Sequence, residues 1–158
     1  MTEGRGAEFV DASCVILIFC SEGYFTSVNC MRELLRAVVT KKRILTLLEL
    51  DAKHGGLTQD TIRVQLDAAS APCSKGDSEY ASMYHMWGLT SEVERWGYFM
   101  PSAEELWAAM FASEPIEWNR IGFFQVMSHA PVLSASPRLF TFASCAFRVR
   151  FRTSPCVS

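Results

Sequence analysis

The sequence lacks the short motifs that mark the commonest nucleotide and hydrolase sites. The phosphate-binding patterns G-x-G-x-x-G and G-x-x-x-x-G-K-[ST] do not occur, and neither does the G-x-S-x-G pattern of a nucleophilic serine. No two cysteines are spaced as C-x-x-C, and His54, His85 and His129 do not combine with the cysteines in the spacing of a zinc site. We therefore expect neither a metal nor a bound cofactor.

We also expect no segment that directs the chain to a membrane or out of the cell. Its first residues are polar and mixed in charge, without the basic region and small-residue cleavage site of a signal peptide. The apolar runs are well short of the roughly 20 residues that a membrane helix needs. A net charge of −2 produces no strong field that would favour nucleic acid or lipid. We expect a cytoplasmic protein with reduced cysteines and with no nucleic-acid or membrane partner.

Two continuously apolar runs, Cys14–Cys20 and Ile44–Leu50, stand out from the rest of the chain. A polar turn, Ser21–Gly23, ends the first run, and a helix with one apolar face begins near Ser27 or Asn29. The order strand, loop, helix, strand predicts a parallel sheet, and runs that are apolar on both faces suit strands covered by helices on both sides. The predicted fold class is α/β, with a short, mostly parallel sheet of three or four strands flanked by helices.

Downstream patterns predict further helices and one more strand. Residues 58–69 predict a helix capped by its threonine, and residues 80–96 predict two short helices. Residues 98–100 predict a short edge strand. Ser102 and Glu105 then form a capping box that opens another helix.

The composition changes at residue 128. Residues 114–120 predict a turn that leads into an amphipathic helix over 121–127. From Ser128 to Ser158 there is no Asp or Glu, while four arginines remain among Ser, Pro and Phe. We therefore divide the chain into a domain over 1–127 and a poorly ordered basic tail over 128–158. A tail that binds RNA or anionic lipid is the alternative.

The first apolar run and the residues after it form a recognisable pattern, which consists of Val15 to Ser21, Tyr24, Ser27, Cys30, Glu33 and Leu34. This pattern resembles part of a TIR domain (Toll/interleukin-1 receptor/resistance protein). In that family a strand ends in a serine. After it come an aromatic residue, a second serine, often a Trp-Cys pair, and an acidic residue before Leu. The next strand of the family resembles Ile44–Glu49.

The chain departs from the family pattern in two ways. Asn29 stands where the family often has Trp. About a dozen residues precede Cys14, so the expected chain is an N-terminally truncated, divergent, protist-like member that lacks the first two strands and the loops after them. The resemblance thus implies an incomplete flavodoxin-like TIR fold.

The resemblance implies two functions. TIR domains of receptors and adaptors signal by associating with other TIR domains, and some TIR domains cleave NAD⁺ between nicotinamide and ribose. The resemblance places the catalytic glutamate at Glu33, whose anion would stabilise positive charge on the ribose without a metal. Residues that would line the substrate site are Ser21, Tyr24, Ser27 and Cys30.

Each of these residues also has a purely structural interpretation. Glu33 suits the first turns of a helix, or an ion pair with a neighbouring arginine. Ser21 and Ser27 are equally turn and cap residues, and Tyr24 is equally a packed aromatic. The positive surface predicted from Arg32, Arg36, Lys41, Lys42 and Arg43 suits either a partner or solvent.

The function that we expect is intracellular signalling by TIR-type association with other TIR-like domains or with a second copy. NAD⁺ glycohydrolase activity with Glu33 as the key carboxylate is the alternative. A truncated product without independent activity is the second alternative.

Overall fold

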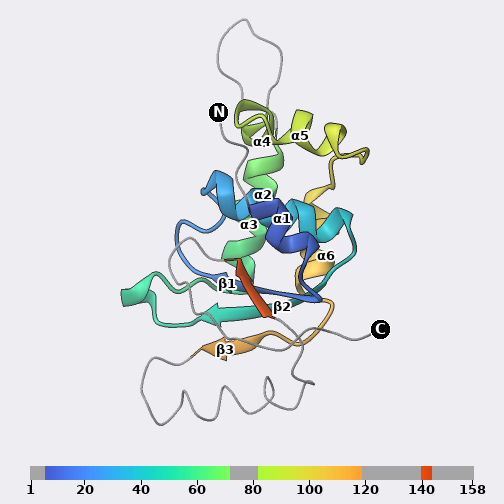
Figure 1. The fold of residues 1–158 in the computed structure, drawn as a ribbon. Coiled ribbons are helices and arrows are strands. Elements are labelled where there is room, and N and C mark those ends of the chain that lie inside the picture. The colour runs from blue at the N-terminus through green and yellow to red at the C-terminus, as the bar shows by residue number, and fades with distance from the viewer. Residues whose placement is uncertain (1–5, 72–81, 119–139, 144–158) are drawn as a thin grey trace, which may run out of the picture.

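A four-stranded parallel sheet organises the protein (Figure 1). The computed structural model describes residues 6–71, 82–118 and 140–143. In these residues the strand order is β3-β2-β1-β4, and all three pairings are parallel. The strands are β1 (Val15–Cys20), β2 (Arg43–Glu49), β3 (Ile116–Trp118) and β4 (Phe140–Ala143). The predicted α/β class with a short parallel sheet is confirmed.

The two central strands follow the apolar runs of the sequence to within one residue. They pair from Val15 opposite Arg43 to Cys20 opposite Leu48. Cys14 is an exception, because it precedes β1 at a bend and is exposed rather than buried in the strand.

The helices agree with their predicted start signals. Ser27 caps α2, Thr58 caps α3, and Ser102 with Glu105 forms both hydrogen bonds of a capping box at the start of α6. The helices are α1 (Gly6–Asp11), α2 (Val28–Val39), α3 (Gln59–Ser70), α4 (Met83–Met86), α5 (Leu89–Arg95) and α6 (Ala103–Met110), with a 3₁₀ turn η1 (Ala52–His54).

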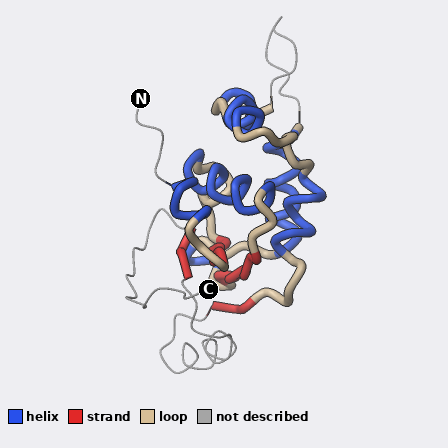
Figure 2. Tube along the Cα trace, turned by 45° about the vertical axis from the view of Figure 1, so that its right-hand side comes forward, coloured by secondary structure: helices blue, strands red, loops and turns tan. Residues whose placement is uncertain are grey.

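The described helices all lie on one face of the sheet (Figure 2). On that face Ile16, Ile18 and Leu48 pack against apolar side chains of the helices. Leu17 and Leu47 belong to a separate cluster on the opposite face, which contains only strand residues among those described. The connections from β1 to β2 and from β2 to β3 move across the sheet in the same direction. Because crossovers between parallel strands are right-handed, both connections lie on the same face of the sheet. We predicted helices on both faces of the sheet, but in the described part of the chain they cover one face only.

Two local predictions are wrong. Residues 98–100 form a loop rather than an edge strand, because Gly97 adopts φ 83° after α5 and the Tyr98 amide donates back to the Val93 carbonyl. The predicted turn over 114–120 contains β3, since Ile116 to Trp118 pair with the end of β2.

One segment of the expected tail takes part in the sheet. β4 pairs with β1 from Val15 opposite Phe140 to Ile18 opposite Ala143. The amphipathic helix expected over 121–127 and the tail residues 128–139 and 144–158 lie outside the described residues, as does most of the linker before α4. None of the helices in the described ranges is long and apolar enough to cross a membrane.

Candidate functional site

The loop after β1 is a compact turn that its own backbone holds together. The Tyr24 amide donates to the Ser21 carbonyl over 3.0 Å, and the Ser27 amide donates to the Tyr24 carbonyl over 3.2 Å. Gly23 adopts φ 84°, a left-handed conformation that glycine reaches without steric cost. The loop thus delivers the chain directly to the N-cap of α2.

The predicted substrate-site residues of this loop are brought together, and their side chains have structural contacts. Tyr24 is buried beside Phe25, with ring centroids 5.1 Å apart, and its hydroxyl lies 3.5 Å from the Cys30 carbonyl. Ser27 Oγ accepts a hydrogen bond from the Cys30 amide over 3.4 Å. Cys30 is buried, whereas Ser21 is half-buried. These contacts position the start of α2.

The loop after β2 packs against the loop after β1 at the same edge of the sheet. Ser21 forms an antiparallel bridge with Gly56, and the Glu22 amide donates to the Gly55 carbonyl over 2.7 Å. A Cβ atom on Gly56 would lie 2.7 Å from the Glu49 carbonyl oxygen, so this approach requires glycine. The carboxyl ends of β1 and β2 are therefore joined by backbone contacts.

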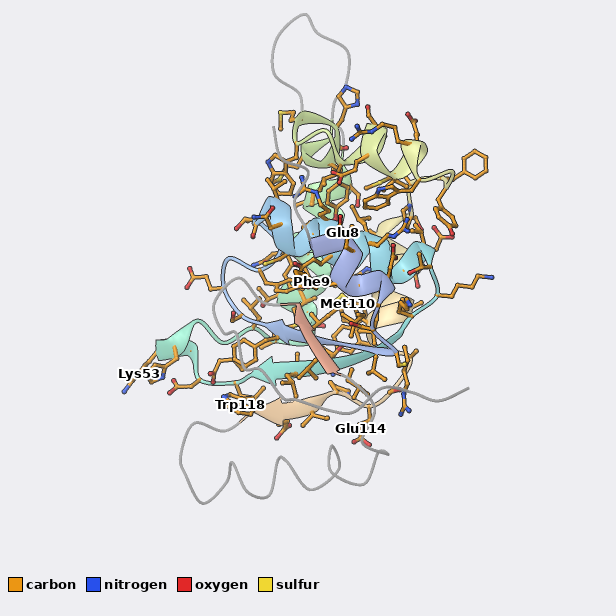
Figure 3. The ribbon with its side chains drawn as sticks, viewed as in Figure 1. Glu8, Phe9, Lys53, Met110, Glu114 and Trp118 are labelled. Atoms are coloured by element: carbon orange, nitrogen blue, oxygen red, sulfur yellow. The ribbon has the colours of Figure 1, made fainter. Side chains whose placement is uncertain are left out.

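The second loop contains an Asp–His pair. His54 Nδ1 lies 2.7 Å from Asp51 Oδ2, and both side chains are about half-exposed at the edge of the molecule where Figure 3 labels Lys53. Asp51 also accepts from the Lys53 amide, and its own amide donates to buried Glu49. The neighbouring glycines were the only sequence signal for this arrangement. Within the described residues, no group of three or more His, Cys, Asp and Glu is placed to hold a metal ion.

Glu33 lies on α2 and is half-buried beneath α1. A Cβ atom on Gly6, the first residue of α1, would lie 2.6 Å from Glu33 Oε1. Burial raises the pKa of the Glu33 carboxyl to about 7, although the nearby positive charge of Arg32 opposes this rise. A carboxyl with such a pKa is partly protonated at neutral pH.

Two of the five residues of the predicted positive surface are paired with carboxylates in the described part of the chain. Arg32 Nε donates to both carboxylate oxygens of Glu92 over 2.9 and 2.8 Å. Arg36 forms two 2.8 Å hydrogen bonds with Asp11 and stacks 5.0 Å from the Trp96 ring centroid. Lys42 donates to the Asp11 carbonyl over 2.8 Å. Lys41 and Arg43 are exposed, so positive charge remains between the end of α2 and the start of β2.

An exposed aromatic pair lies in the loop between α5 and α6. Phe99 is 96% exposed and Tyr98 is 41% exposed, whereas neighbouring Pro101 is buried. The sequence signal for this loop was the apolar run at 98–100, from which we predicted a strand instead of an exposed loop.

No family model, no curated protein and no solved structure matches the chain. The resemblance of the central stretch to TIR domains therefore stays a prediction.

Proposed function

We propose that this chain is an intracellular signalling module that acts by TIR-type association with another TIR-like domain or with a second copy of itself. The observation that supports this proposal is the display of Phe99 on the loop between α5 and α6. A large apolar side chain left in water gains free energy when a partner covers it. Aromatic residues of this kind frequently dominate the binding energy of an interface.

The loop that carries Phe99 is fixed at both ends. The Tyr98 amide donates to the Val93 carbonyl over 3.2 Å, and Trp96 is stacked with Arg36. On the other side of Phe99, Pro101 is buried and the Ser102 capping box starts α6. A side chain presented on a fixed loop loses little conformational entropy on binding, which favours association.

The residues predicted to bind substrate also favour association over catalysis. Tyr24 and Cys30 are buried, and Ser27 is occupied as the cap of α2. The first turn of α1 covers the Glu33 carboxyl, whereas stabilising positive charge on a ribose requires a carboxylate that the substrate can reach.

Concentration-dependent sedimentation of the purified chain tests this proposal. With chain concentrations up to roughly 100 µM, we expect to measure self-association with a Kd of micromolar order. Phe99→Ser should weaken it about tenfold or more, since interface hot spots typically contribute at least that much. Val64→Ser is the matched control, because Val64 is 66% exposed on α3. A wild-type chain that stays monomeric and binds no TIR domain would contradict the proposal, as would equal effects of the two substitutions.

NAD⁺ cleavage at Glu33 is a second candidate function, which the raised pKa of a half-buried carboxyl supports. NAD⁺ consumption by wild type and by Glu33→Ala would distinguish it. Activity that disappears in Glu33→Ala while association persists would establish an enzyme. A chain that neither associates nor consumes NAD⁺ would instead match a truncated product without independent activity.

A further inference from the structure

The short helix α1 is held to α2 by ionic contacts at its carboxyl-terminal end. Asp11 accepts two 2.8 Å hydrogen bonds from Arg36, and the Asp11 carbonyl accepts another from Lys42. Val10 is buried in the main core, and the Ser13 hydroxyl donates to the Phe9 carbonyl over 2.6 Å. This end of α1 is therefore firmly anchored.

The amino-terminal end of α1 has a different kind of contact. A Cβ atom on Gly6 would lie 2.6 Å from Glu33 Oε1, 3.0 Å from Glu33 Cγ and 3.3 Å from Glu33 Cδ. The Gly6 backbone thus rests directly on the Glu33 carboxyl group. A side chain at position 6 would displace this carboxyl, so the glycine allows the close approach.

In the described part of the chain, no positively charged side chain forms an ion pair with the Glu33 carboxylate. Arg32, its neighbour on α2, donates to Glu92 of α5 and to Asn29. The strand β4, which also packs on α2, has no charged residue. The other charged groups on α2 and on the helices that pack on it are exposed or already paired. They are Glu8 and Asp11 on α1, Arg36 on α2, Glu94 and Arg95 on α5, and Glu104 and Glu105 on α6.

We propose that α1 is a pH-responsive cover of α2, whose amino-terminal turn packs on Glu33 while this carboxyl is protonated and separates from it when the carboxyl ionises. The Asp11–Arg36 anchor keeps the helix attached at its other end. Opening would expose the Glu33 carboxylate to solvent and free the adjacent surface of α2. This control is independent of whether the chain associates with a partner or cleaves NAD⁺.

The direction of the pH effect follows from proton linkage. The pKa of Glu33 is about 7 with α1 packed, and it approaches the ordinary value of 4.5 when water reaches the carboxyl. The packed state therefore binds the proton more tightly. The packing constant should fall about tenfold per pH unit between these two pKa values and become constant above the higher one. The total change is at most about 300-fold.

Hydrogen exchange of the α1 amides measures this opening directly. We would record protection factors for the amides of residues 9–12, corrected for intrinsic exchange, from pH 5 to pH 8.5 in wild type and Glu33→Gln. Wild-type protection should fall as the pH rises to about 7 and then level off. Glu33→Gln should keep the high protection at every pH, because its amide has the shape of the protonated acid and no charge.

Two control variants separate this effect from other changes. Glu8→Gln removes an exposed charge from α1 itself and should leave the wild-type pH profile unchanged. Asp11→Asn should lower protection at every pH, which shows that the assay detects the attachment of α1. A wild-type profile without pH dependence would overturn the proposal, and so would the same slope in Glu33→Gln. A ¹³C titration of the Glu33 carboxyl provides a measurement in the unmodified chain, and a midpoint near 4.5 would equally overturn it.

Discussion

Thr46 Oγ1 donates a 2.6 Å hydrogen bond to the Met110 carbonyl and so joins the centre of β2 to the carboxyl-terminal end of α6. Figure 3 shows Met110 between the helical layer and the sheet. The last carbonyls of a helix have no partner within the helix, and this one is satisfied by the hydroxyl of Thr46, a residue that is only 2% exposed. One buried polar contact thus fixes the distance between the two layers.

Thr46→Val should reduce the free energy of unfolding by about 1–3 kcal/mol, because it leaves a buried carbonyl without a donor while keeping the shape of the side chain. Urea denaturation monitored by tryptophan fluorescence would measure the loss. Thr90→Val, at a half-exposed position of α5, should change the stability by less than about 0.5 kcal/mol. Equal stability of Thr46→Val and wild type would show that this contact contributes nothing.

Asp11→Asn should destabilise the chain at neutral pH by about 0.5–1 kcal/mol, a small amount because the Asp11 side chain is 44% exposed and screened by water. The Arg36 hydrogen bonds lower the pKa of Asp11 below its ordinary 3.8. The contribution is therefore complete above 3.8 and is lost as the pH falls through the lower folded value. Denaturation at pH 7 in low and high salt would measure it, with Glu114→Gln as an exposed control. A loss that salt does not reduce would contradict an ionic origin.

Local signals were sufficient to predict the centre of the fold. The apolar runs located β1 and β2, and capping residues located the starts of α2, α3 and α6, because these features depend on neighbours along the chain. The strands β3 and β4 are only three and four residues long, and their pairing with distant strands determines them. No alternation in such short segments distinguishes a strand from a turn.

The environment of the candidate site could be predicted only in part. The sequence located Ser27 as a cap and indicated that Tyr24 could be a packed aromatic, and both roles are seen. The contact of Gly6 with Glu33, which buries the carboxyl, is a tertiary contact that no local pattern signals. The arginine pairs with Glu92 and Asp11 likewise depend on how α5 and α1 pack on α2.

Ser27→Ala should destabilise the chain by about 1 kcal/mol, because Ser27 caps α2 and accepts from the Cys30 amide. Ser27→Asp should retain most of the stability, since Asp is an equally good cap. Urea denaturation of the three proteins would compare them. If Ser27→Ala is as stable as wild type, the cap contributes nothing measurable, and a role of Ser27 at the surface of the loop gains support.

Glu33→Gln should stabilise the whole chain at alkaline pH and have little effect in acid. The folded pKa of about 7 exceeds the ordinary 4.5, so the folded state binds more protons between these values. The unfavourable contribution of Glu33 is therefore absent below 4.5, grows as the pH rises, and is complete above about 7, where it reaches at most about 3 kcal/mol.

Urea denaturation of wild type and Glu33→Gln at a series of pH values would measure this difference, because the other titrating groups cancel between the two proteins. Glu94→Gln is the matched control, since Glu94 is an exposed glutamate on α5 whose substitution should have an effect close to zero at every pH. A stability difference between Glu33→Gln and wild type that does not change with pH would mean that Glu33 ionises freely beneath α1, and the packing of Gly6 on a protonated carboxyl would then be wrong.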